Sequence, residues 1–413
     1  MQKIYLYKTT NQSVSYDKNN WYINDQLQEG PNNDDAQTHK EKAYAEAYRL
    51  AADDVIRYTN HFKNIAVLAA AGTSVGNGGK SRMALWESCE EEINAISHVL
   101  MSNNDNLKEK CQSIVEAKDI EEFLSLTILY EKLNGEIKGN NDSLHRRDLE
   151  KKISDACRLS LGYNTHHQDF IQKLTARKPS EPRIQLYTTN YDTLFEQAAQ
   201  KMNYTIIDGF SFSYPRQFNG SNFDYDVVYR ERTRIRNEES FVPNVIQIFK
   251  LHGSVDWERK GNTIYQKEST DSPCIIYPAS EKYESSYEQP YFEMMSHFQS
   301  TLRKEGTLLV VVGFGFKDKH IQNIIKEAVL QNPNFHLLVV CYGMTKSNQD
   351  DKKEEMVESG ITHELVPDFV TESGVITQNV TVIFSKFEDF VDNYPYNNSY
   401  DLISQINNET VRS

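Results

Sequence analysis

Short apolar runs rich in β-branched residues alternate with helical patterns along most of this chain, and this alternation limits its fold more than any other feature. The apolar runs are Ile65–Ala70, Ile184–Tyr187, Val245–Phe249, Ile275–Tyr277, Leu308–Val312, His336–Val340 and Val380–Phe384. Helical spacing of apolar residues follows several of them, at Asp192–Met202, Tyr291–Lys304 and Asp318–Leu330. Such alternation predicts an α/β fold with a doubly wound, mostly parallel sheet.

Two parts of the chain depart from this alternation. Between residues 81 and 180, apolar residues such as Leu85, Ile93 and Phe123 recur at helical spacing without a convincing strand, which predicts a large helical insertion. Residues 1–45 show short polar and apolar alternation and then turn polar, which is typical of a small β arm followed by a loop. We therefore divide the chain into an N-terminal arm (1–45), a main domain (46–396) and a C-terminal tail (397–413).

The charge balance limits the partners of the chain. Its 413 residues include 45 Lys and Arg against 59 Asp and Glu, for a net charge of −14. Direct binding of nucleic acid depends on basic residues that neutralise phosphates, so we do not expect it here. The basic segment Arg230–Arg236 could contact an acidic partner, but a solvated edge strand or loop is the simpler interpretation.

Cysteine usage and the apolar segments indicate a cytoplasmic protein. The five cysteines are scattered with no Cys-x-x-Cys pair, which is typical of a reducing compartment and argues against a four-cysteine zinc site. No apolar stretch reaches the length of a membrane span, and the first residues do not resemble a signal peptide.

Small or polar residues follow four of the apolar runs, where ligands of open parallel sheets bind. The first of these loops is Ala71-Gly72-Thr73-Ser74, whose small residues let backbone N–H groups approach a phosphate. The loop fits neither the Gly-x-Gly-x-x-Gly pattern nor the Walker A pattern. A structural turn explains its glycines equally well.

The second loop, Thr188–Asp192, carries an amide and a carboxylate. For Asn190 alone, capping of the following helix is the simpler interpretation. Its carboxamide can also hold sugar hydroxyls or a water without carrying charge. Asp192 can accept a hydrogen bond from an amide group of a ligand.

The third loop contains His252, followed by Gly253 and Ser254. A lone His is usually structural, but a glycine beside it at a strand end favours an accessible imidazole that can act as a base. The neighbouring Trp257 either forms a wall of the site or packs in the core.

The fourth loop runs from Gly313 to Phe316, and its two glycines allow close approach of a ligand. Asp318 is expected to cap the helix that follows, and His320 is expected on the surface of that helix.

In this order, the four loops resemble the nucleotide site of the sirtuin family: a Gly-Ala-Gly-type loop, a Thr-x-Asn-x-Asp segment, a His-Gly pair and a late Gly-x-Gly. Longer segments narrow the resemblance to the sirtuin-like subunit of two-gene bacterial antiviral systems whose other gene encodes a HerA-type hexameric ATPase. These segments are Gly76–Lys80, Gly209–Ser211, Arg216–Phe218, Asn222–Asp224, Tyr277–Pro278, Gly313–Asp318, Asn332–His336 and Tyr394–Pro395. The resemblance covers roughly residues 60–396 and implies a Rossmann-like, sirtuin-like domain.

The resemblance implies NAD as the substrate and assigns residues to it. Asn190 and His252 would be the catalytic pair, and Asp192 would contact the nicotinamide side. The candidate cofactor-binding residues are Ala71, Gly72, Thr73 and Ser74 at the pyrophosphate, Gly313, Gly315 and Phe316 near the adenosine half, and the adjoining Thr189, Tyr191 and Ser254. The chain lacks the zinc-binding cysteines of protein-deacylating sirtuins, so we expect no zinc.

The activity implied by the resemblance is NAD hydrolysis to nicotinamide and ADP-ribose, acting in anti-phage defence by NAD depletion. The implied partners are a HerA-type ATPase and further copies of this chain in a ring-like homo-oligomer. Two other classes of function stay open: a non-catalytic NAD or ADP-ribose sensor, and a protein deacylase or ADP-ribosyltransferase. The missing zinc module and the helical insertion argue against deacylation.

Overall fold

A computed structural model of the chain describes residues 4–17, 19–28, 36–80, 82–102, 105–138, 145–163, 165–178, 180–229, 241–268, 270, 273–275, 289–316, 318–341 and 379–395. The basic segment Arg230–Arg236, the expected strand residues 276–277 and the C-terminal tail lie outside these residues.

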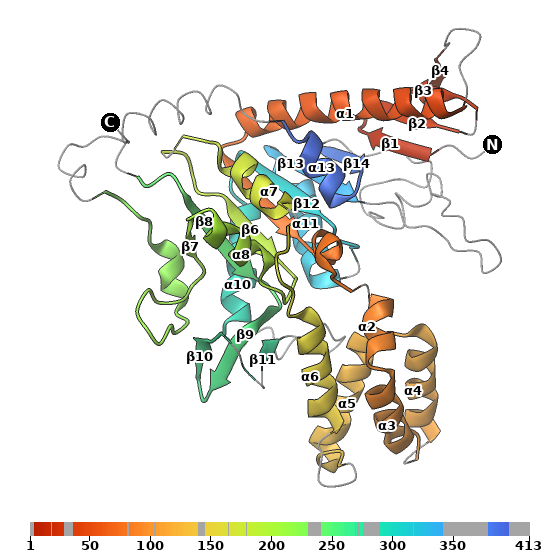
Figure 1. The fold of residues 1–413 in the computed structure, drawn as a ribbon, viewed down its shortest axis with the longest axis vertical. Coiled ribbons are helices and arrows are strands. Elements are labelled where there is room, and N and C mark those ends of the chain that lie inside the picture. Colours follow the sequence, from red (N-terminus) through yellow and green to blue (C-terminus); the bar gives the residue numbers. More distant parts are fainter. Residues whose placement is uncertain are drawn as a thin grey trace.

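The described residues form one large sheet, which confirms the expected α/β fold (Figure 1). Its strands stand in the order β4-β3-β2-β1-β14-β13-β12-β5-β6-β8-β7. The parallel part comprises β14 (Val380–Phe384), β13 (Phe335–Cys341), β12 (Thr307–Val312), β5 (Asn64–Ala69), β6 (Gln185–Thr188), β8 (Val245–Lys250) and β7 (Thr205–Ile207). Apart from the short β7, each parallel strand coincides with one of the apolar runs of the sequence.

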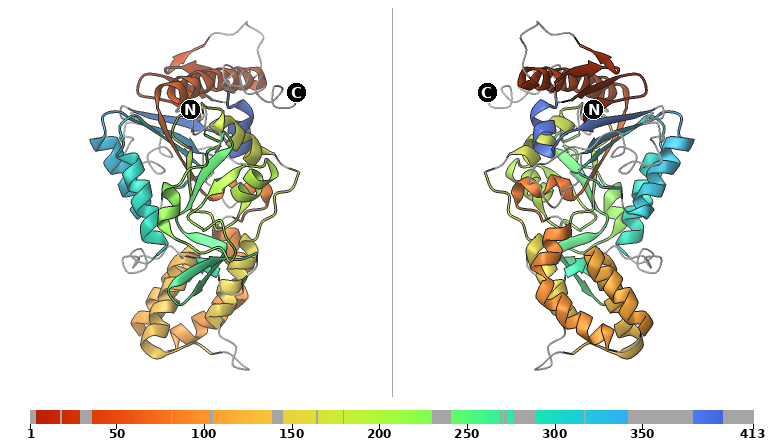
Figure 2. Two further views of the ribbon diagram at one scale, coloured as in Figure 1. Left: turned by 90° about the vertical axis from the view of Figure 1, so that its left-hand side faces the viewer. Right: turned by 90° about the vertical axis from the view of Figure 1, so that its right-hand side faces the viewer.

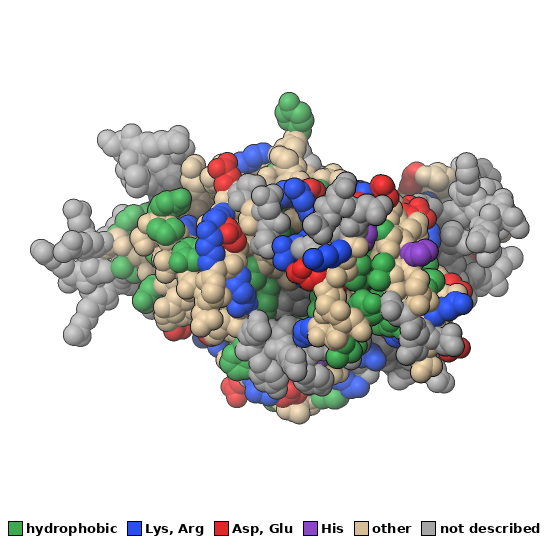
Figure 3. Space-filling model, turned by 90° about the horizontal axis from the view of Figure 1, so that it is seen from below, with side chains coloured by type: hydrophobic (Ala, Val, Ile, Leu, Met, Phe, Trp, Pro, Cys, Tyr) green, Lys and Arg blue, Asp and Glu red, His purple; other side chains and the backbone are tan. Residues whose placement is uncertain are grey.

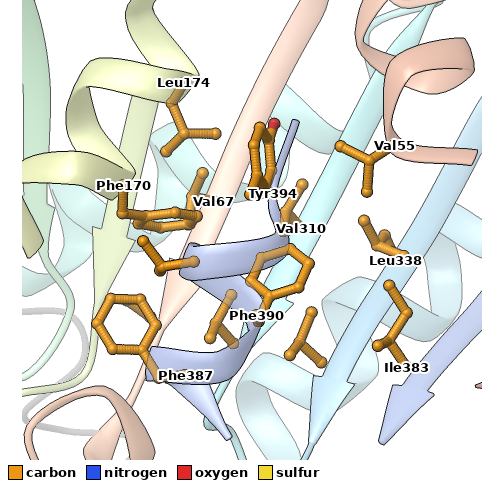
Figure 4. Packing of buried hydrophobic residues seen from close by; sticks show 14 of the residues in the cluster. Val55, Val67, Phe170, Leu174, Val310, Leu338, Ile383, Phe387, Phe390 and Tyr394 are labelled. Atoms are coloured by element: carbon orange, nitrogen blue, oxygen red, sulfur yellow. The ribbon is translucent and has the colours of Figure 1, made fainter. Parts of the chain in front are cut away.

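Helices cover both faces of the sheet, as alternation along β12 shows. Leu309 and Val311 pack on the face covered by α10 (Tyr291–Leu302) and α11 (Lys319–Gln331). Leu308 and Val310 pack on the opposite face. The helices on that face are α1 (Ala36–His61), α7 (His166–Thr175), α8 (Leu194–Lys201) and α13 (Phe387–Asn393). Figure 4 shows this second core, where Phe387 and Phe390 of α13 lie beside Phe170 of α7.

The N-terminal residues extend the sheet. Strands β1 (Ile4–Lys8), β2 (Ser13–Tyr16), β3 (Trp21–Ile23) and β4 (Gln26–Leu27) form an antiparallel meander, and β1 pairs antiparallel with β14. The division at residue 45 falls inside α1, which packs on these strands.

A buried polar network holds the meander to the core. The hydroxyls of Tyr7 and Tyr58 donate to the Asp54 carboxylate over 2.6 and 3.1 Å. Tyr58 also shares a 3.0 Å hydrogen bond with Thr381 of β14, whose hydroxyl lies 3.1 Å from His336. Burial lowers the pKa of His336 to about 3, so the ring is neutral at neutral pH. The network therefore joins α1, β1, β13 and β14.

The helical insertion is present and has its own core. Helices α2 (Arg82–Ser88), α3 (Glu90–Met101), α4 (Asp105–Ala117), α5 (Ile120–Asn134) and α6 (His145–Cys157) pack around Trp86, Ile93 and Phe123. The helical block, defined as α2–α6, projects from one end of the molecule, whereas α1 lies at the opposite end (Figures 1 and 2).

A second, three-stranded antiparallel sheet follows β8, and the sequence patterns did not predict it. It consists of β10 (Thr263–Gln266), β9 (Gly253–Lys260) and β11 (Pro273–Ile275), in that order. Trp257 of β9 is buried against Phe210, so it packs in the core. Ile275 is the described residue of the expected Ile275–Tyr277 strand, and it pairs with Gly253 of β9 in this second sheet.

The face of the molecule seen from below carries charges of both signs. Lys and Arg side chains are interspersed there with Asp and Glu (Figure 3). Among the described residues, none of the helices has the length and apolar character needed to cross a membrane.

Candidate functional site

A cavity of about 780 Å³ lies where β12, β5, β6 and β8 end. These strands are neighbours in the sheet, where β5 lies between β6 and β12. The chain continues from β5 to β6 on one side of β5, and it later returns to form β12 on the other side. Such a reversal of strand order is where open α/β sheets bind ligands, just beyond the carboxyl ends of the strands. The volume is within the usual range for a small-molecule site.

Most of the candidate residues line this cavity. Those that line it are Ala71, Ser74, Thr189, Asn190, Tyr191, Asp192, His252, Gly313 and Gly315. Gly72, Thr73, Ser254 and Phe316 are not among the lining residues. Thr73 and Ser254 are buried, and the Ser254 hydroxyl donates to the backbone carbonyl of Tyr191 over 3.3 Å.

Two glycines let the first and fourth loops touch. The backbone N–H of Gly72 donates to the Gly313 carbonyl over 3.1 Å. A Cβ at Gly72 would stand 2.6 Å from the Gly313 Cα, and Gly313 has a φ of +67°. A side chain fits at neither position without moving a loop, so these glycines allow the close approach of the first and fourth loops.

The side chain of Asn190 is fixed by the first loop. Its Nδ2 donates to the Ala70 carbonyl, the Thr73 hydroxyl and the Ser74 hydroxyl over 3.1, 3.2 and 2.9 Å. The interpretation of Asn190 as the cap of α8 is wrong, because Thr193 occupies the N-cap position and Asp192 Oδ1 accepts from the Leu194 N–H. The orientation of the Asn190 amide is thus set by its partners at the carboxyl end of β5.

Asp192 ties the same loops together. Its Oδ2 accepts a 2.7 Å hydrogen bond from the Ser74 hydroxyl, while Oδ1 accepts from the Leu194 N–H over 3.1 Å. Both oxygens therefore have partners that hold the carboxylate at the cavity wall.

A buried ion pair supports this loop from below. Lys250, at the end of β8, donates from Nζ to the backbone carbonyl of Asp192 and lies 3.1 Å from the Glu196 carboxylate on α8. Burial raises the pKa of Glu196, and the nearby ammonium of Lys250 opposes that rise. The pair anchors the loop between β6 and α8 to β8.

His252 lies two residues after the end of β8 and faces Asp318. Its Nε2 is 3.1 Å from Asp318 Oδ2, and both side chains are largely buried. The ring also lies 6.4 Å from the ring of Tyr191, centroid to centroid. Gly253, with a φ of +82°, makes the turn that starts β9 and leaves the imidazole at the cavity.

The helical block and α11 complete the cavity wall. Leu85, Asp119, Ile120, Glu122, Ala156 and Cys157 contribute from the helical block or its connections. Burial raises the pKa of Cys157 to about 12, so this thiol is neutral at physiological pH. The basic side chains at the wall are Lys80 after the first loop and Lys319 and His320 on α11. His320 therefore lines the cavity, in addition to its place on the helix.

We found no group of three or more metal-binding side chains within the described part of the chain. The five cysteines are free thiols.

The fold and site define an α/β protein with a nucleotide-sized cavity at the point where the strand order reverses. Residues 184–363 match the sequence profile of the SIR2-like domain family. This region, which includes Asn190, Asp192, His252 and Gly313–Phe316, is therefore similar to that family.

Other comparisons are more distant. No curated protein sequence matches the chain. A solved structure described as "The Structural basis for Sirtuin Substrate affinity" aligns with 12% identity and a TM-score of 0.35, over 82% of this chain and 95% of the other.

Several residues of the site were not predicted from the sequence. Asp318 was expected only as a cap of α11, although it also contacts His252. The Lys250–Glu196 pair and the cavity-lining side chains of the helical block were not expected either. For the ion pair, the available signal in the sequence was Lys250 at the end of an apolar strand, because a buried Lys needs a partner.

Proposed function

We propose that this protein binds NAD in the cavity and hydrolyses the bond between nicotinamide and ribose, which gives nicotinamide and ADP-ribose. The observation that carries the proposal is the convergence of Asn190, Asp192 and His252 on one cavity from the ends of neighbouring strands. All three residues fall within the SIR2-like match.

The chemistry requires little acid catalysis, because nicotinamide leaves as a neutral molecule from a pyridinium. The site must hold the ribose and supply a nucleophile to an oxocarbenium-like centre. In this proposal the Nδ2 of Asn190 stays with its three acceptors, and its carbonyl oxygen accepts from a ribose hydroxyl or the attacking water. His252 takes a proton from that hydroxyl or water, a role typically worth about 10²–10⁴-fold in rate.

The remaining contacts follow from the cavity wall. Ala71 and Ser74 lie where the pyrophosphate would approach the first loop, and Lys80 supplies a cation nearby. Gly313 and Gly315 would face the adenosine half, and the Asp192 carboxylate would face the nicotinamide carboxamide. NAD serves here as a substrate, and zinc has no role in the proposed reaction.

The sequence motifs resemble those of the sirtuin-like subunit of two-gene antiviral systems, and this resemblance supports a proposed biological role. The role is anti-phage defence by NAD depletion, carried out by a ring-like homo-oligomer with a HerA-type ATPase. The helical block then provides a surface beside the cavity through which a partner could favour one arrangement of the site.

The proposal is tested by supplying NAD to the purified protein, alone and with its candidate ATPase, and separating the products by chromatography. Asn190→Ala and His252→Ala should each lose most nicotinamide release. Asn393→Ala and His98→Ala remove the same residue types at exposed positions on α13 and α3 and should keep it. Folded Asn190→Ala and His252→Ala proteins with wild-type turnover would show that the catalytic assignment is wrong.

Calorimetry separates hydrolysis from sensing, the main alternative. A sensor would bind NAD without consuming it. In that case Asn190→Ala and His252→Ala would change only the affinity for NAD. Acyl-peptide turnover that depends on NAD would instead favour the deacylase alternative.

A further inference from the structure

We propose that Asp318 is the positioning residue of His252, an inference that rests on the proposed function. In this account the Asp318 carboxylate holds the imidazole in one orientation and one tautomer, so that the ring is ready to act as the base.

The two side chains come from loops that follow different strands of the sheet, and they meet at the cavity. His252 follows β8 and Asp318 follows the loop after β12, and both line the cavity. Nε2 and Oδ2 are 3.1 Å apart, and the side chains are only 10% and 9% exposed. A charged hydrogen bond that is shielded from water in this way is stronger than one on the surface.

The carboxylate is held in place by α11. Its Oδ1 accepts from the backbone N–H groups of His320 and Ile321 over 3.0 and 3.4 Å. Phe316, with a φ of +52°, makes the turn just before it and packs against Phe314. One oxygen of Asp318 therefore caps the helix, which leaves the other to orient the imidazole.

The hydrogen bond also selects a tautomer. When Nε2 carries the proton that is donated to Asp318, the lone pair of the neutral ring is on Nδ1. In the reaction, Nδ1 takes a proton from water as the water oxygen bonds to the ribose C1′ and the bond to nicotinamide breaks. The imidazolium that results is stabilised by the adjacent carboxylate, and its proton later returns to solvent.

Other titratable or charged groups face the same cavity from each element around it. They are Lys80 after the first loop, Asp119, Glu122 and Cys157 of the helical block, Tyr191 and Asp192 before α8, and Lys319 and His320 of α11. Asp318 differs from them in placing a carboxylate oxygen 3.1 Å from the imidazole, while its other oxygen caps α11.

The test compares Asp318→Asn with Glu327→Gln in the full chain. Asn is as good an N-cap as Asp, so Asp318→Asn keeps the cap and removes the charge. Glu327→Gln removes a charge from the same helix at a carboxylate paired with Arg303, outside the cavity lining. Histidine labelled with ¹³C and ¹⁵N reports the tautomer and titration midpoint of His252, which is assigned with His252→Gln.

We expect the Nε2–H tautomer in the wild-type protein. Because a nearby carboxylate favours the imidazolium, Asp318→Asn should lower the His252 midpoint by about one to three pH units. The acid limb of the kcat profile should move down with it, and kcat at neutral pH should fall about tenfold or more. Glu327→Gln should change none of these.

An unchanged tautomer and midpoint in Asp318→Asn would overturn the proposal, even if stability or activity fell, because Asp318 would then be a helix cap alone. A failure of the proposed function gives a different result. If no variant and no wild-type protein consumes NAD, the His252 titration still decides whether Asp318 positions the ring.

Discussion

The Ser74 hydroxyl donates a 2.7 Å hydrogen bond to the Asp192 carboxylate, which joins the loop after β5 to the loop after β6. The same hydroxyl accepts from Asn190 Nδ2 over 2.9 Å. Ser74 is therefore the point through which two candidate catalytic side chains are held in a fixed relation.

Replacing Ser74 should damage the site more than the fold. Ser74→Ala removes the donor to Asp192 and one acceptor of Asn190, and a buried polar group left without its partner costs about 1–3 kcal/mol. We expect NAD turnover to fall at least tenfold while the protein stays folded. Steady-state kinetics and thermal unfolding check both parts. Ser102→Ala, which loses an exposed hydroxyl bonded to the His98 carbonyl, should change neither.

The close approach of the first and fourth loops depends on Gly72. Gly72→Ala puts a Cβ 2.6 Å from the Gly313 Cα, and overpacking of this kind typically costs about 1–3 kcal/mol. We expect a lower midpoint of denaturant unfolding. Gly315→Ala is the matched control for stability, because an added Cβ there meets nothing within 4 Å. Equal stability of the two variants would contradict the close approach of the first and fourth loops.

The Lys250–Glu196 pair gives a prediction with a pH dependence. Lys250→Met leaves a buried carboxylate without its cation, which should lower the free energy of unfolding by about 3–5 kcal/mol at neutral pH. Burial already raises the Glu196 pKa in the folded state, so the folded protein favours the protonated acid. Stability from this group is greatest below the pKa of the unfolded chain and is lost as pH rises through the folded pKa.

The defect of Lys250→Met should therefore shrink on acidification and grow toward alkaline pH, as measured by urea unfolding at several pH values. Adding Glu196→Leu to Lys250→Met should restore much of the loss, since the unpaired carboxylate is then absent. A defect that is independent of pH, or that the second substitution makes worse, would contradict a paired Glu196.

Assembly is a separate prediction that rests on the resemblance. We expect the purified chain to form a ring-like homo-oligomer and a HerA-type ATPase to change its NAD turnover several-fold. Light scattering and product analysis test this. A monomer at micromolar concentration whose turnover is indifferent to the ATPase would contradict the antiviral-complex proposal and leave the proposed NAD site intact.

The sequence predicts the parallel strands well, because runs such as Leu308–Val312 are apolar enough to be buried on both faces. It also predicts the helical insertion, whose apolar spacing reflects a core of its own. The sequence does not predict β9–β11, because this sheet is only half buried and polar residues such as Glu258 and Lys260 interrupt its apolar pattern.

The site was predictable as a set of loops but not as a set of contacts. Strand order determines which loops meet, and local pattern cannot show that β12 lies beside β5. For the same reason Asn190 resembled a helix cap, although its partners lie on the loop after β5. Asp318 did fit its expected capping role, and that role concealed its contact with His252.

The most direct test of hydrolysis is to follow NAD in water enriched in ¹⁸O with the wild-type protein. The account predicts equal amounts of nicotinamide and ADP-ribose, with one ¹⁸O in the ADP-ribose that comes from attack at the ribose C1′. NAD that is recovered intact, or ADP-ribose found attached to protein in place of the labelled product, would contradict it.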